Sequence, residues 1–107
     1  MVQALETKEE FDEFLEQNKD KLIVIDFHAE WCGPCKIMGP KFEKMAPDYK
    51  NAAFAKVDVD ENEDVAEECD IEAMPTFQFF KGGEKVAEVT GAKFDVLEEK
   101  VKELHEA

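Results

Sequence analysis

The chain has 107 residues, of which 44% are hydrophobic and 37% charged, and its formal net charge is −14. These values predict one soluble globular domain, residues 1–107, with a core that needs no metal or structural disulfide. The negative charge argues against nucleic acid as a partner, because a polyanion would be repelled. No apolar run is long enough to span a membrane, so no membrane partner is expected.

The N-terminus and the cysteines favour a reducing compartment. The first residues carry neither a basic segment nor an apolar one, so no secretory signal is visible. The chain has three cysteines, and Cys32 and Cys35 are separated by only two residues. Such a pair is more typical of a redox or metal site than of a secreted disulfide framework. We therefore expect a cytoplasmic protein.

The first quarter of the chain predicts a strand, a helix and a second strand. Residues Val2 to Leu5 suit a short strand. Thr7 and Glu10 form a capping-box pattern, and the helix that follows is expected to end near Asn18. Residues Leu22 to Phe27 are almost continuously apolar and suit a central strand that is covered on both faces.

The middle of the chain continues the alternation. Lys36 to Tyr49 has helical spacing of apolar residues, and Pro40 is expected to kink that helix. A strand is predicted at Ala53 to Val59, and a short acidic helix at Asn62 to Cys69.

The last third predicts a hairpin and a helix. Phe77 to Phe80 and Val86 to Val89 are strands joined by a tight turn at Lys81 to Glu84, and a final helix covers Phe94 to His105. The resulting order, β-α-β-α-β-α-β-β-α, predicts an α/β fold. Its central mixed sheet should have about five strands and be flanked by four helices on both faces.

The Cys32-Gly33-Pro34-Cys35 segment carries the chemistry. It lies between a strand and a helix, where unpaired N–H groups favour a thiolate. Ionisation near neutral pH requires roughly 2 kcal/mol, whereas a helix terminus usually supplies about 0.3–1 kcal/mol. We therefore expect further hydrogen bonds to the Cys32 sulfur from the N–H and S–H of Cys35. Pro34 suits the first helical turn, and a stiff linker should favour the oxidised form.

A metal half-site is the alternative interpretation of this pair. Zinc needs a second pair of ligands, and the remaining candidates are His28, Cys69 and His105. They form no second pair in the sequence, which favours redox chemistry and predicts no metal.

Asp26 interrupts the most apolar strand. Burial should raise the pKa of its carboxyl group, and we interpret it as a proton acceptor for Cys35. The alternative is a carboxylate that local hydrogen bonds satisfy or that lies at a strand edge. Lys56, on the next strand, would either offset the charge of Asp26 or be a solvated lysine.

Several motifs together resemble the thioredoxin family, and most of all its animal and other eukaryotic members. They are Trp31 to Lys36, Val24 to Phe27, Val57 to Asp60, Met74 to Phe77, Phe79 to Gly82, and Gly91-Ala92. The resemblance implies the thioredoxin fold and protein-disulfide reduction, with Cys32, Cys35 and Asp26 as catalytic residues. It further implies no bound cofactor, because a separate thioredoxin reductase would supply electrons from NADPH.

The resemblance also implies a docking surface for client proteins. Pro75 would follow a cis peptide bond beside the disulfide, and the backbone of Met74 would pair with an extended client segment. The residues expected to complete this surface are Trp31, Val59, Ile71, Ala73, Met74, Gly91 and Ala92. A place in the core is the alternative for Trp31, Val59 and Ile71.

Other interpretations stay open at this point. They are a disulfide oxidase or isomerase, which Gly33-Pro34 disfavours, a non-catalytic interaction module, and a metal carrier. Cys69 is expected to be a buried structural thiol, and His105 a surface residue. Ala73 stands where some animal relatives have a cysteine that forms intermolecular disulfides, so we expect a monomer.

Overall fold

The computed structural model describes residues 2–106, and its elements follow the predicted order. In chain order they are β1 (Val2–Ala4), α1 (Lys8–Gln17), β2 (Leu22–His28), α2 (Gly33–Met45), a 3-10 turn (Ala46–Asp48), β3 (Ala52–Asp58), α3 (Glu63–Glu68), β4 (Thr76–Lys81), β5 (Glu84–Thr90) and α4 (Phe94–Glu106).

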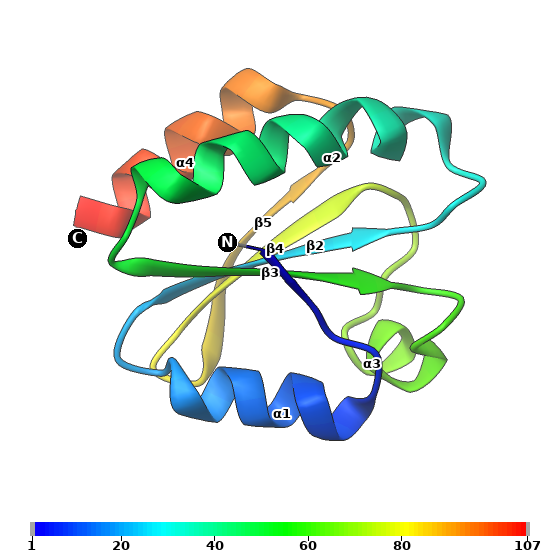
Figure 1. Cartoon of the computed structure of the whole chain (residues 1–107), viewed down its shortest axis with the longest axis horizontal. Coiled ribbons are helices and arrows are strands. Elements are labelled where there is room, and N and C mark those ends of the chain that lie inside the picture. Colours follow the sequence, from blue (N-terminus) through cyan, green and yellow to red (C-terminus); the bar gives the residue numbers. More distant parts are fainter. Residues whose placement is uncertain (1, 107) are drawn as a thin grey trace.

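The strands form one mixed sheet in the order β1-β3-β2-β4-β5. Strands β1, β3 and β2 are parallel, whereas β4 is antiparallel to both β2 and β5. Helices α2 and α4 cover one face of the sheet, and α1 and α3 cover the other (Figure 1). The predicted α/β fold with helices on both faces is confirmed. None of the helices in residues 2–106 is long and apolar enough to cross a membrane.

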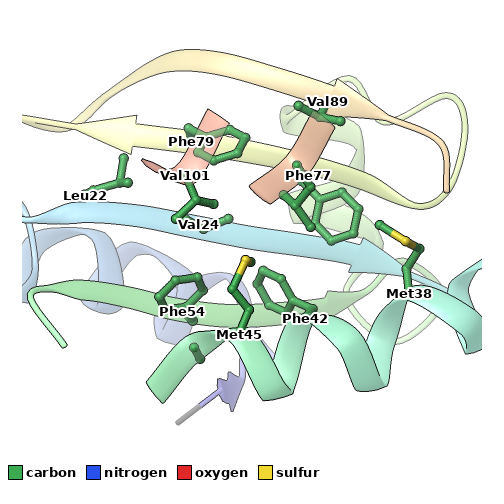
Figure 2. Packing of buried hydrophobic residues seen from close by; sticks show 12 residues of the cluster. Leu22, Val24, Met38, Phe42, Met45, Phe54, Phe77, Phe79, Val89 and Val101 are labelled. Carbon is green, nitrogen blue, oxygen red and sulfur yellow. The ribbon is translucent and has the colours of Figure 1, made fainter. Parts of the chain in front are cut away.

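The central strand β2 divides the core into two layers. Leu22 and Val24 belong to the cluster beneath α2 and α4, where they meet Phe42 and Phe77 (Figure 2). Ile23, Ile25 and Phe27 point to the opposite face and pack with residues of α1 and α3. Because side chains alternate along a strand, Asp26 shares the face of Leu22 and Val24 and lies toward α2.

The ends of α2 differ from the prediction. The helix begins at Gly33 rather than Lys36, with Pro34 in its first turn, and it runs continuously through Pro40. It ends at Met45 rather than Tyr49, because Pro47 has no backbone N–H to continue the helical hydrogen bonds, although Ala46 before it still has helical φ and ψ of −52° and −45°. The chain continues there as a single 3-10 turn.

Two local predictions concern a helix cap and a hairpin turn. The Thr7 side chain accepts a hydrogen bond from the Glu10 N–H at 3.1 Å, as a helix cap requires, whereas Glu10 Oε1 accepts from the Glu6 N–H at 2.8 Å rather than from the Thr7 N–H of a capping box. Gly82 and Gly83 both have positive φ, 62° and 84°, which a two-residue hairpin turn requires. The helix cap and the hairpin turn are confirmed.

Candidate active site

Strand β2 and helix α2 place the two cysteines at one end of the sheet. Cys32 is the N-cap residue of α2 and forms a disulfide with Cys35, one turn along the helix, at a Cα–Cα distance of 5.3 Å. The Cys35 backbone N–H donates to Cys32 Sγ at 3.2 Å. This is one of the expected hydrogen bonds, and it directs a helix N–H toward the sulfur that would carry negative charge.

The disulfide lies in a small apolar cluster. Cys32 is 5% exposed and Cys35 is 6% exposed, and both pack with buried Ala29. Val59 and Met74, both half-buried, pack against this cluster. The disulfide therefore has apolar neighbours and exposes only a small fraction of its surface to solvent.

Asp26 is buried beneath α2. Its side chain is 3% exposed, and Oδ1 has no hydrogen-bond partner within the described residues. Burial raises the pKa of this carboxyl group from 3.8 to about 7. β2 lies between β3 and β4, so the alternative position at a sheet edge is wrong.

Lys56 and Glu43 set the charge around Asp26. Lys56 is paired in register with Asp26 on the neighbouring strand, and its Nζ lies 3.2 Å from Glu43 Oε2. The positive charge of Lys56 lowers the pKa of Asp26, and the negative charge of Glu43 raises it. Lys56 is thus ion-paired rather than merely solvated. Glu43 was not predicted, because its relation to Lys56 depends on how α2 lies over the sheet.

Trp31 lies on the surface next to the disulfide. Its side chain is 67% exposed, so the alternative place in the core is wrong. Its indole Nε1 donates to Asp60 Oδ2 at 2.8 Å. Asp60 was not predicted as a site residue, although it closes the Val57 to Asp60 motif.

Two loops complete the surroundings of the cysteines. The Met74–Pro75 peptide bond is cis, as the resemblance implied, and Pro75 is buried. Gly91 has φ +97°, and its N–H donates to the Pro75 carbonyl at 2.8 Å. This bond holds the Gly91 loop against the Pro75 loop. Ala73 and Ala92 are exposed on these loops, which leaves them accessible to a partner.

Ile71 and Cys69 lie elsewhere. Ile71 is half-buried in the cluster beneath α1 and α3, and the structure does not bring it into the cluster of Cys32 and Cys35. Cys69 packs at the edge of the Ile71 cluster and is only half-buried, so the prediction of a buried thiol is wrong. It ends the short helix α3, which leaves one side open. Burial still raises the pKa of the Cys69 thiol to about 11.

The two histidines take different positions. His28 lines an open cavity of about 600 Å³ together with Cys35 and Glu43, and burial lowers the pKa of its imidazole. His105 packs edge to face on Tyr49, with 5.2 Å between ring centroids, and is half-buried rather than fully on the surface. Residues 2–106 contain no group of three or more His, Cys, Asp or Glu side chains that could hold a metal ion.

A disulfide between two cysteines one turn apart at a helix N-terminus is the arrangement of the thiol–disulfide oxidoreductases. Comparisons with known proteins agree. A model of the Thioredoxin family matches residues 2–103. Human thioredoxin is 50% identical over 104 residues, an alignment that covers 97% of this chain and 99% of its relative.

Solved structures show the same likeness. The X-ray structure of Fasciola hepatica thioredoxin has a TM-score of 0.94 at 41% identity, covering 96% of this chain and 99% of its own. Reduced Schistosoma mansoni thioredoxin pre-protein has a TM-score of 0.92 at 44% identity, covering 96% and 97%. The chain belongs to the thioredoxin family, whose members use their own redox-active disulfide without a bound cofactor.

Proposed function

We propose that this chain reduces disulfide bonds in client proteins, with Cys32 as the nucleophile. The observation that carries the proposal is the position of Cys32. It caps helix α2 and accepts the Cys35 N–H, and it lies within bonding reach of Cys35. These features favour a thiolate on Cys32 once the disulfide has been reduced.

The reaction proceeds in two exchanges. The Cys32 thiolate attacks one client sulfur, forms a mixed disulfide and expels the other client sulfur as a thiolate, which takes a proton from water. The Asp26 carboxylate then accepts the proton of Cys35. The Cys35 thiolate attacks Cys32, reforms the Cys32–Cys35 disulfide and releases the second client thiolate. Two electrons pass from the protein to the client.

Family membership supports the remaining parts of the proposal. A thioredoxin reductase would regenerate the dithiol with electrons from NADPH, and the chain would act as a cytoplasmic monomer. The client would dock on exposed and half-buried residues around the disulfide, which are Trp31, Val59, Ala73, Met74, Gly91 and Ala92.

Insulin reduction tests the activity. With NADPH and a thioredoxin reductase, we expect turbid insulin chains to form while NADPH is consumed, and Cys32→Ser should abolish both signals. A Cys35→Ser variant should accumulate mixed disulfides with clients. Cys69→Ser serves as the matched control and should behave like the parent chain. Absence of reduction together with absence of trapped clients would instead indicate a non-catalytic interaction module. A reduction potential close to those of secretory oxidants would indicate an oxidase.

A further inference from the structure

A groove between α2 and the start of α4 has no part in the chemistry described so far. It encloses about 420 Å³ and is lined by Ile37 and Lys41 of α2, by Phe94 and Val96 of α4, and by Ala92 and Lys93 before α4. Helices α2 and α4 lie side by side on one face of the sheet (Figure 1). We refer to this feature as the α2–α4 groove.

The groove exposes apolar surface. Ile37 is 61% exposed and Val96 is 46% exposed. Within residues 2–105 they are two of four large apolar side chains that are exposed, the others being Trp31 and Val86. Two such side chains on one groove form an apolar patch that a partner could cover.

The groove is also locally positive on a strongly acidic chain. Lys41 and Lys93 line it, and Asp95 supplies one carboxylate. Lys41 Nζ lies over the Phe94 ring, 5.5 Å from its centroid, so the ammonium group is next to an apolar side chain of the groove. The net charge of the whole chain is −14. A positive patch against that background favours an occupant that carries a carboxylate beside an apolar side chain.

The groove lies within reach of a client bound to Cys32. Ile37 follows Cys32 by five residues, or about 7.5 Å along the helix axis, and Lys41 by about 13.5 Å. An extended segment advances about 3.3 Å per residue. It would therefore reach the level of Ile37 in about two to three residues and the level of Lys41 in about four. Ala92 follows Gly91, whose N–H is bonded to the Pro75 carbonyl, so the groove continues from the loops beside the disulfide.

We propose that the α2–α4 groove is a specificity subsite for client proteins. It accepts an apolar side chain two to three residues from the reacting client cysteine and a carboxylate about four residues away. The apolar side chain lies between Ile37 and Val96, and the carboxylate meets Lys41 and Lys93. The inference rests on the proposed function, because it assigns the substrate preference of that same site.

Short peptides activated with 5-thio-2-nitrobenzoate test the preference. Each peptide has one cysteine in disulfide linkage with this group. The reduced protein attacks the peptide sulfur and expels the coloured thiolate, and Cys35 then releases the peptide thiol. The series carries Leu and Glu, Leu and Lys, or two alanines at the predicted spacing, both before and after the cysteine. In one of these directions, we expect the Leu-Glu peptide to react about threefold to tenfold faster than the Leu-Lys peptide.

Variants assign the preference to the groove. Lys41→Glu combined with Lys93→Glu should invert the preference for Glu over Lys in the peptide. Lys44→Glu makes the same charge change on α2 outside the groove and should retain most of that preference. Ile37→Ser combined with Val96→Ser should remove the advantage of Leu over Ala. Val86→Ser is the matched control, because Val86 is 47% exposed on β5. The charge preference should also shrink at 0.5 M salt.

The outcomes separate the two proposals. A protein that releases no nitrobenzoate from any peptide contradicts the proposed function itself. If the protein releases nitrobenzoate normally but at equal rates from all peptides, the subsite alone is overturned. The same holds if the control variants abolish the preference as fully as the groove variants do. A dimer in sedimentation that Ile37→Ser and Val96→Ser dissociate, without any peptide preference, would assign the groove to a second copy of the chain and overturn the subsite.

Discussion

Asp26 and Lys56 lie directly opposite each other on β2 and β3, and Lys56 extends to Glu43 on the helix that covers them. Burial holds the pKa of Asp26 at about 7, and the two neighbours act on it in opposite directions. The group proposed to move the proton of Cys35 therefore titrates in the range where the reaction would run. Two charged side chains outside the disulfide adjust that value.

Replacing Asp26 with Asn should stabilise the oxidised protein at high pH. The folded pKa lies above the unfolded value, so the stability of the parent falls as pH rises from about 4 through 7. A change from 3.8 to about 7 corresponds to roughly 4 kcal/mol of unfolding free energy. Urea unfolding should show Asp26→Asn to be more stable at pH 8, with the difference shrinking toward pH 4. Equal stabilities at pH 8 would show that the buried carboxylate carries no such cost.

The same variant should slow the second exchange. Without the carboxylate, Cys35 loses its proton acceptor. General-base assistance typically contributes about 100-fold or more to a rate, and water acting as the base in its place should restore part of that loss. We expect release of the client from the Cys32 mixed disulfide to fall by roughly tenfold or more at pH 7. Stopped-flow measurement of that step should also lose its inflection near pH 7. An unchanged profile would assign the inflection to another group.

Charge changes at Lys56 and Glu43 should move the pKa of Asp26 in opposite directions. Lys56→Met removes the charge that lowers this pKa and should raise it, whereas Glu43→Gln removes the charge that raises it and should lower it. Titration of the Asp26 carboxyl carbon by NMR in the oxidised protein measures both. Lys44→Met, on the same helix, is the matched control. Shifts of the same sign in both variants would contradict the arrangement.

The Trp31–Asp60 hydrogen bond should support client binding. An exposed indole held by one 2.8 Å bond loses its fixed orientation when the acceptor is removed. Asp60→Ala should lower kcat/KM toward insulin by about threefold to tenfold, mainly through KM. Asp60→Asn retains an acceptor oxygen and should lose less. Reactivity toward small disulfides should stay unchanged, and a matching loss there would place Asp60 in the chemistry instead.

Cys69 should react slowly with alkylating agents despite its partial exposure. Burial raises its thiol pKa to about 11, so very little thiolate exists at pH 7.5. In the oxidised protein, mass spectrometry after iodoacetamide treatment should show labelling at least about tenfold slower than for free cysteine, whose pKa is about 8.5. Labelling as fast as free cysteine would reveal an unprotected, reactive thiol.

Local pattern predicted most of the fold and part of the site. The run Ile23 to Phe27 is apolar on both sides of the strand, so the burial of Asp26 followed from its neighbours alone. Cys32 and Cys35 could be identified as the reacting pair from their spacing and from the helix predicted after them. The end of α2 was missed because the helical spacing of apolar residues outweighed the effect of Pro47 on the backbone.

The remaining site residues depend on tertiary placement. Asp60 meets Trp31 across 29 residues of sequence, and Glu43 meets Lys56 only because α2 lies over β3 at one particular rotation. Neither pairing leaves a periodic signal within its own segment. The α2–α4 groove has the same origin, since Ile37 and Val96 each have the pattern of an ordinary solvent-facing helix position.

The backbone bond between Gly91 and Pro75 links two loops that reach the cysteines from different strands of the sheet. Because this bond couples the two loops, a displacement of one loop should displace the other as well. Clients of different sequence would then have to adapt their own flexible segments to these two loops.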